Sequence, residues 1–247
     1  MHGLLKLTLT EMKLFLREPA AAFFTLLFPL LVLMCFGGIY GNEPTPFFGG
    51  YGSVDVSVPA YTAMIIGSSG LIGLTVIMSM YRERGILRRL KATPVRPQII
   101  LSANVIVSFL MTALGMFLLI VVGKLVYSLR FAGNPLNLLA AFTLSSLSFF
   151  ALGFLLAGLT PTARTAQVIG MILFYPMLFL CGATVPLEVL PPRIQQYAAF
   201  LPMTHVVKLL RGMWIGESWS QHWTEVGVLT AMLVIGVAVS AKTFRWE

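Results

Sequence analysis

Charged residues are concentrated in one short segment, residues 81–97, which reads YRERGILRRLKATPVRP. The segment holds six of the 17 basic residues of the chain, together with Glu83. The acid comes first and the cations follow, which is the order that a helix dipole favours, and Thr93-Pro94 then ends the helix. A short rigid helix with both charge signs can fix its register on a partner protein. Cations beside a membrane also enforce topology and bind anionic lipid, and the residues alone favour neither role.

The spacings typical of catalytic and phosphate-binding sites are missing. The Gly-Lys pair Gly123-Lys124 is not followed by Ser or Thr, and Leu118 stands where a phosphate-binding loop has its first glycine. No Ser/His/Asp or Cys/His set is persuasive. Cys35 and Cys181 lie in apolar stretches, which predicts buried thiols and no metal site. We therefore expect no catalytic residues, no metal, no cofactor and no ATPase motif in this chain.

One basic stripe has two interpretations. His205, Lys208 and Arg211 recur every three residues, so one face of a helix could present them together. A face that touches water or lipid headgroups is the simpler interpretation. A site for an anionic substrate or lipid is the alternative.

Uncharged polar and aromatic residues recur inside the apolar stretches. We predict that the following line a transport pathway: Asn104, Ser108, Thr112, Ser145, Ser148, Phe149 and Phe174. An apolar pathway with a few hydrogen-bonding groups suits amphiphilic or drug-like cargo. For any single Ser or Thr, a hydrogen bond to its own helix backbone is the competing interpretation.

The elements that position these residues must lie in a membrane. Of the 247 residues, 57% are hydrophobic and 11% are charged, whereas a soluble chain is roughly 25% charged. A helix needs about 20 apolar residues to cross the hydrocarbon. We predict one all-α membrane domain, residues 1–247, with six spans at 20–39, 59–80, 98–127, 135–159, 166–185 and 223–241. Pro59 and Pro135 each suit the first turn of a helix.

The distribution of Lys and Arg predicts the orientation. With a cytoplasmic amino terminus, 12 of the 17 basic residues face the cytoplasm, so both termini are expected there. The same rule accounts for the net charge of +8 without nucleic acid as a partner. Lys124, near the outer end of the third span, is the ionisable residue that we identify inside the spans, and we expect no carboxylate there. Ion-coupled transporters carry such carboxylates, so the energy source is predicted to lie outside this chain.

Two further segments flank the spans. Residues 4–17 predict an amphipathic helix in the membrane interface, with Lys6, Lys13 and Arg17 on one narrow face and apolar residues opposite. Residues 186–217 are too polar and proline-rich for a full span. They predict short helices that dip into, or lie at, the outer interface.

Small residues recur at the four-residue spacing that lets helices approach closely. The pairs are Ser69 and Gly73, Gly153 and Ala157, Gly227 and Ala231, and Gly236 and Ser240. Packing within the chain is the simpler interpretation, and a dedicated dimer contact is the alternative.

The chain resembles the membrane permease subunits of type-2 ATP-binding-cassette (ABC) transporters, especially bacterial drug exporters of the daunorubicin-resistance type. The run from Arg82 to Pro94 is close to the family pattern R-E-R-G-T-L-x-R-L-x-x-T-P-x, with Ile86 where threonine is common. The amphipathic amino-terminal helix and the proline-rich segment before the last span add to the resemblance. The resemblance to the family extends over nearly the whole chain.

The resemblance implies that residues 81–97 form a cytoplasmic coupling helix, which docks on a separate ATPase subunit that binds ATP and magnesium. The coupling contacts carried over from the pattern are Arg82, Glu83, Arg84, Gly85, Arg88 and Arg89. A second permease, identical or similar, would complete a pathway across a bacterial inner membrane. Drugs or other hydrophobic compounds are the expected cargo, and polysaccharide, lipid or haem export is the alternative. A non-ABC secondary transporter and a membrane-embedded enzyme or assembly factor are the competing classes.

Overall fold

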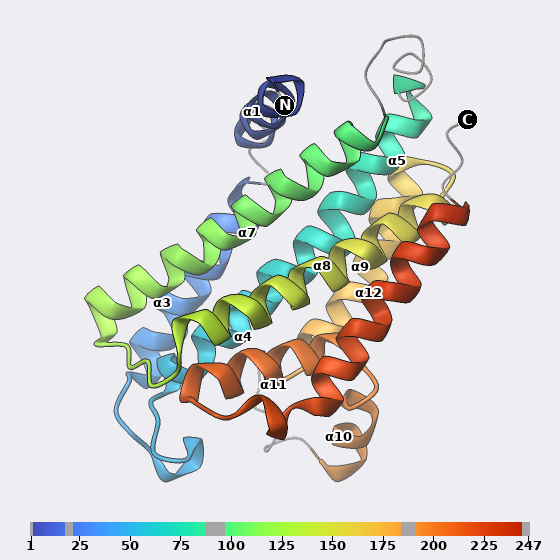
Figure 1. Cartoon of the computed structure of the whole chain (residues 1–247). Helices are drawn as coiled ribbons and strands as arrows, with labels where there is room; N and C mark the ends of the chain where they lie inside the picture. Colours follow the sequence, from blue (N-terminus) through green and yellow to red (C-terminus); the bar gives the residue numbers. More distant parts are fainter. Residues whose placement is uncertain (1, 18–21, 87–96, 184–190, 244–247) are drawn as a thin grey trace.

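The computed structural model describes residues 2–17, 22–86, 97–183 and 191–243, which form helices and loops with no strand among them (Figure 1). Within these residues, five helices are long and apolar enough to cross a membrane: Ser53–Glu83, Ile99–Tyr127, Pro135–Leu159, Ala163–Leu180 and Trp223–Ser240. The first expected span contributes a shorter apolar helix, Thr25–Tyr40. The all-α membrane architecture is confirmed, and the count of six spans stays a prediction.

Local signals set several helix boundaries. Helix α8 (Pro135–Leu159) has the predicted limits, because Pro135 occupies its first turn and the Asn134 side chain accepts a hydrogen bond from the Leu136 N–H at 2.8 Å. Helix α9 (Ala163–Leu180) begins earlier than expected, after Thr162, whose hydroxyl accepts from the Thr165 N–H, and it ends at Leu180, before the predicted limit of 185. Helices α7 (Pro97–Tyr127) and α12 (Trp223–Thr243) lie close to their predicted limits.

The second span differs from the prediction at its start. It consists of α4 (Ser53–Ser68), the π-helical segment η3 (Ser69–Leu74) and α5 (Thr75–Glu83). The helix begins at Ser53 because Asp55 accepts a hydrogen bond from the Gly52 N–H at 3.1 Å and closes the first turn. The expectation that Pro59 lies in the first turn is therefore wrong, and Pro59 lies inside α4.

Three glycines, which we call the glycine seam (Gly70, Gly153 and Gly170), let η3 contact α8 and α9 backbone to backbone. A Cβ on Gly153 would lie 2.2 Å from the Gly70 carbonyl oxygen, and one on Gly170 would lie 2.4 Å from that of Leu71. The Thr75 hydroxyl lies 3.2 Å from the carbonyl oxygens of both Gly70 and Gly153. The widened π-turn and the seam together join the middle of the second span to its neighbours.

The predicted small-residue pairs divide into two groups. Gly153 is in the seam, and a Cβ on Gly236 would lie 2.9 Å from the Ala151 Cβ, so both mark close helix contacts. A Cβ on Gly227 would meet nothing within 4 Å, and one on Gly73 would have only ordinary contact. Spacing alone does not separate the two groups, because it does not say which face of a helix meets a neighbour.

The helices are arranged with distinct ends (Figure 1). Helix α1 (His2–Arg17) lies at the same end as the end of α5 and the end of α12, and the short helices α10 (Pro192–Ala198) and α11 (Pro202–Ile215) lie at the opposite end. Helix α3 (Phe28–Tyr40) contacts α4 and α7. Among the described residues between α9 and α12, the α-helices are α10 and α11, both too short for a full span, and 184–190 lies outside the described residues.

The core lies between α4, α8 and α11, where large apolar side chains such as Ile65, Phe142 and Met203 are fully buried. Helix α11 is thus packed into the bundle. Cys181 is buried as predicted, but Cys35 is exposed, because it lies on a face of α3 that the described part of the chain leaves uncovered.

Candidate functional site

The last turn of α5 is fixed to the loop between α8 and α9. One Arg82 nitrogen, Nη1, donates to the Gly158 carbonyl at 3.0 Å, and the other, Nη2, donates to the Thr160 carbonyl. One turn earlier, the buried hydroxyls of Ser79 and Thr160 are 2.9 Å apart. The guanidinium therefore satisfies the carbonyls that the end of α8 leaves without helical partners.

Glu83 closes the start of the next helix. Its Oε2 accepts a hydrogen bond of 2.8 Å from the backbone N–H of Ala163, the first residue of α9. A carboxylate is stabilising at a helix amino terminus, where the N–H groups and the helix dipole are positive. Arg82 and Glu83, adjacent in sequence, thus hold the end of α8 and the start of α9. We call these two residues the α5 clamp.

The same turn of α5 holds the amino-terminal helix. The Tyr81 hydroxyl lies 2.7 and 2.8 Å from the two carboxylate oxygens of Glu11, and Leu7 packs against a cluster that contains Met78 and Ile100. Helix α1 therefore contacts α5 and α7 through both a polar and an apolar link. No pattern in the sequence indicates this role of Glu11.

Two of the three predicted cations of α1 lie where an interfacial helix would place them. Lys13 and Arg17 are exposed, and the side chain of Lys6 lies outside the described residues. Leu9 and Leu14 are also exposed, which leaves apolar surface on α1 for lipid. The helix is confirmed, and its place in the interface stays a prediction.

The predicted coupling residues divide at the end of α5. Gly85 has φ +64°, a left-handed conformation that ends α5. Arg84 is exposed there, whereas the clamp residues Arg82 and Glu83 are engaged within the chain. Arg88 and Arg89 lie outside the described residues. Docking by these six residues stays a prediction, for which Arg84 is an exposed candidate, whereas Glu83, also exposed, already accepts a hydrogen bond from Ala163.

Comparison with known proteins identifies the family. Residues 3–214 match the model of the family described as ABC-2 type transporter. The chain belongs to this family. It is a multi-pass membrane protein of this permease family.

The chain is similar to proteins that are named after different roles. Nodulation protein J of Rhizobium leguminosarum bv. viciae is 33% identical over 107 residues, which are 43% of this chain and 41% of that protein. The putative transport permease ycf38 of Porphyra purpurea is 25% identical over 241 residues, 92% of this chain and 79% of that protein. The probable multidrug ABC transporter permease YbhR of Escherichia coli (strain K12) is 21% identical, covering 67% of this chain and 46% of that protein. The permease thus spans well under half the length of Nodulation protein J.

Most of the predicted pathway residues are buried inside the permease. Thr112 and Ser148 donate to backbone carbonyls of their own helices, at 2.9 and 2.7 Å, as the competing interpretation expects, and Asn104 does the same at 3.1 Å. Ser148 also donates to the Leu229 carbonyl of α12 at 2.8 Å. The remaining residues are partly or fully buried: Ser108, Ser145, Phe149 and Phe174. Their role as a pathway lining stays a prediction.

Besides Glu83, the last residue of α5, two carboxylates lie in the spans, where none was expected. Asp55 is fully buried in the first turn of α4 and accepts hydrogen bonds from the Asn42 amide at 2.9 Å and the Arg130 backbone N–H at 2.8 Å. Glu225 lies in the first turn of α12. The expectation is wrong because both acids serve the start of a helix, and placing the second span at Pro59 excluded Asp55. Lys124 is exposed in the last turn of α7, as predicted.

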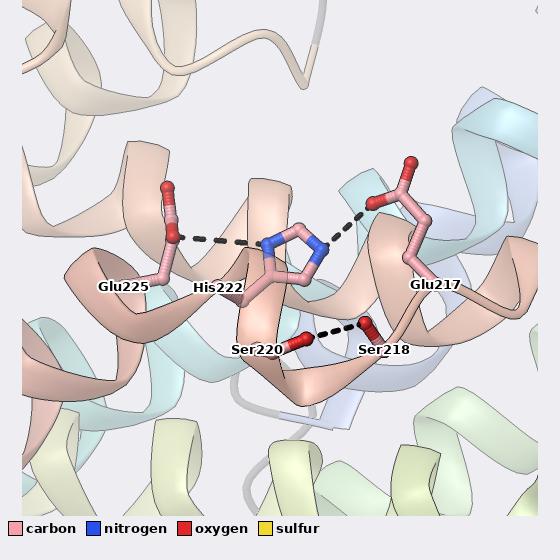
Figure 2. Close-up of polar contacts among 5 residues, drawn as sticks. All are labelled: Glu217, Ser218, Ser220, His222 and Glu225. Carbon is pink, nitrogen blue, oxygen red and sulfur yellow. Dashed lines mark hydrogen bonds and ion pairs between the residues drawn. The ribbon is translucent and has the colours of Figure 1, made fainter.

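Glu225 is part of a cluster that joins α11 to α12. Figure 2 shows the His222 imidazole between two carboxylates, with Nε2 2.7 Å from Glu217 and Nδ1 3.7 Å from Glu225. A Cβ on Gly212 would lie 2.0 Å from the His222 Nε2, so only glycine leaves room for the ring. Among the described residues, no His, Cys, Asp or Glu group is suited to a metal ion. Three ionisable residues within one short segment were the sequence signal for this cluster.

The basic stripe of α11 divides in the structure. His205 is buried, and its burial holds the pKa of the imidazole below its usual value. Lys208 and Arg211 instead line a pocket between α10 and α11. A step of three residues turns a helix by less than one full turn, so the three side chains drift around its axis.

Proposed function

We propose that this permease is the membrane subunit of an ATP-driven exporter that moves drugs or other hydrophobic or amphiphilic compounds out of a bacterial cell. Separate cytoplasmic ATPase subunits bind and hydrolyse ATP with magnesium. Two permeases, identical or similar, form the pathway across the inner membrane. Both termini lie in the cytoplasm, at the end of the bundle that holds α1 and the end of α5.

The observation that carries this proposal is the α5 clamp. Arg82 and Glu83 connect the last turn of α5 to the end of α8 and the start of α9, and Tyr81 connects the same turn to Glu11 of α1. A force that an ATPase applies to the coupling segment after Arg84 therefore reaches four helices at once. Such a connection is what nucleotide-driven closure needs in order to bias the spans between inward-open and outward-open states.

Two further observations support the cargo and the orientation. YbhR, which aligns with 67% of this chain, is named as a probable multidrug permease, and the charged run resembles that of drug exporters. The excess of Lys and Arg at the α1 and α5 end favours a cytoplasmic location for it.

The proposal is tested by efflux from cells that express the permease with its partner ATPase. We expect efflux of several hydrophobic dyes or drugs to require both subunits, and to stop when the ATPase carries a substitution at its phosphate-binding lysine. Efflux that persists with this inactive ATPase would overturn the ATP-driven mechanism. Export of a polysaccharide or lipid, without drug efflux, would overturn the proposed cargo alone.

A further inference from the structure

A pocket of about 290 Å³ lies between α10 and α11, at the end of the bundle opposite α1. Its polar lining consists of Gln195 from α10 and Thr204, Lys208 and Arg211 from α11. Thr204 and Lys208 are four residues apart and Arg211 follows three later, so one face of α11 presents all three side chains to the same space. None of the described lining residues is acidic.

Thr204 supplies an independent sign of a ligand. The residue is 1% exposed, and its hydroxyl is buried without a hydrogen-bond partner among the described residues. A buried hydroxyl is normally paired, because leaving it unpaired costs the full desolvation of the group. This hydroxyl lines the pocket, where an acceptor on a bound molecule would pair it.

The charges in the pocket select the kind of acceptor. Lys208 is exposed and makes no ion pair with the described part of the chain, and Arg211 adds a second positive charge to the same wall. Ammonium and guanidinium groups donate hydrogen bonds and accept none. A hydroxyl donor and two cations together suit the oxygens of a phosphate group, which accept several charge-assisted hydrogen bonds.

The size and surroundings of the pocket fit a headgroup. Ligand pockets for drug-sized molecules have volumes of roughly 300–1,000 Å³. This pocket, at about 290 Å³, is at the lower limit and holds a polar headgroup more readily than a whole drug. Tyr197 and Phe200, beside the pocket residue Ala199, are 72% and 85% exposed. Tyrosine is enriched at the level of lipid headgroups, because its ring is amphipathic.

We infer that the pocket between α10 and α11 binds a phosphate group, with Lys208 and Arg211 facing its charge and Thr204 donating to one of its oxygens. An anionic lipid of the outer leaflet and free phosphate are the two sources of this group. The inference goes beyond the proposed function, because it assigns a ligand whether or not that ligand is transported.

The test is a binding measurement on the full-length permease in nanodiscs of phosphatidylcholine, without any ATPase. The probes are short-chain phosphatidylglycerol, short-chain phosphatidylcholine and inorganic phosphate, with bound molecules counted by native mass spectrometry. We expect phosphatidylglycerol to bind more tightly than the zwitterionic probe. Lys208→Gln should weaken its binding about tenfold, the effect of losing one charge-assisted hydrogen bond. Arg193→Gln, which removes an exposed charge from α10 outside the pocket, should leave binding unchanged.

Thr204→Val separates binding from folding. Removal of an unpaired buried hydroxyl should leave the melting temperature unchanged or raise it, while phosphatidylglycerol binding weakens about threefold. Tighter binding of phosphatidylglycerol than of inorganic phosphate assigns the site to lipid, and equal binding of the two assigns it to the free anion. Absence of binding by both phosphatidylglycerol and inorganic phosphate, or identical affinities in wild type and Lys208→Gln, would overturn the inference. Neither result would alter the proposed transport function, which the assay does not measure.

Discussion

Glu83 accepts a hydrogen bond of 2.8 Å from the backbone N–H of Ala163, so the last residue of α5 closes the amino terminus of α9. The acid of the R-E-R-G run therefore has a partner within its own chain, and so does Arg82 at the preceding position. Arg84, one residue later, is exposed. The first part of the run thus ties α5 to the α8–α9 loop, while docking by its later residues stays a prediction.

We predict that Glu83→Ala separates coupling from docking. The substitution removes the acceptor of the Ala163 N–H, while the Thr162 cap remains, and should lower the free energy of unfolding by about 1 kcal/mol, measured by thermal unfolding in detergent. The ATPase should still co-purify, while efflux falls several-fold because α9 no longer follows α5. Arg84→Ala is the matched variant, and it should reduce co-purification while leaving the melting temperature unchanged. Equal effects of both variants on co-purification would contradict this division.

Gly153 of the glycine seam should not tolerate a side chain. In Gly153→Val, the new Cβ meets the Gly70 carbonyl oxygen, which belongs to the backbone and cannot rotate away. We expect destabilisation of about 3 kcal/mol or failure to accumulate in the membrane, measured by expression level and melting temperature. Gly227→Val is the control, because a Cβ there meets nothing within 4 Å. Similar melting temperatures for the two variants would show that the seam does not hold these helices together.

Gly212 and His222 should be coupled. Gly212→Ala places a methyl group against the imidazole and should displace the ring from Glu217. His222→Ala removes the ring that the methyl group would meet. In a protein that already carries His222→Ala, Gly212→Ala should therefore lower the melting temperature little. A double-mutant cycle on melting temperature should give a coupling of about 1 kcal/mol, within the range for residues in contact. Strict additivity would show that the methyl group is accommodated without moving the ring.

Stability should depend on pH through His205. Because burial lowers the pKa of this imidazole in the folded state, the unfolded chain binds a proton at a higher pH than the native protein does. Stability is therefore fully present above about pH 6.5 and decreases as the pH falls below it. Glu225 opposes the shift and Lys208 of the same helix adds to it. His205→Asn should flatten the pH dependence of the melting temperature between about pH 7 and 5, and an unchanged slope would contradict this assignment.

The sequence predicts the long helices well where an apolar run is bounded by a capping residue or a proline. Asn134-Pro135 starts α8 at the predicted residue, since the cap and the proline both act locally. The start of α4 was misplaced because a proline inside a helix and a proline at its start have the same local pattern. Two partners of Asp55 are distant in the chain: Asn42 is 13 residues away and Arg130 is 75 residues away. No periodicity of the sequence reveals these contacts.

The coupling end was predicted in part. The charged run marks Arg82 and Glu83 as important, but it cannot show that their partners are the backbone groups of residues 158–163. Backbone groups have no sequence signature, so a tertiary contact to them is visible only in the structure. The pocket at α11 shows the same limit. The three-residue spacing groups His205 with Lys208 and Arg211, while packing buries the first and leaves the other two at the cavity.

Asp55 also constrains how the protein enters the membrane. Its donors come from both sides of it in the chain: Asn42 and Gly52 are synthesised before α4, and Arg130 only after α7. With the proposed topology, a carboxylate must cross the hydrocarbon, which is costly for a charged group, before its last donor is available. The hydrogen bonds of Asp55 are therefore complete only when the chain as far as Arg130 lies beside α4. The second and third spans should consequently enter the bilayer as one hairpin during synthesis.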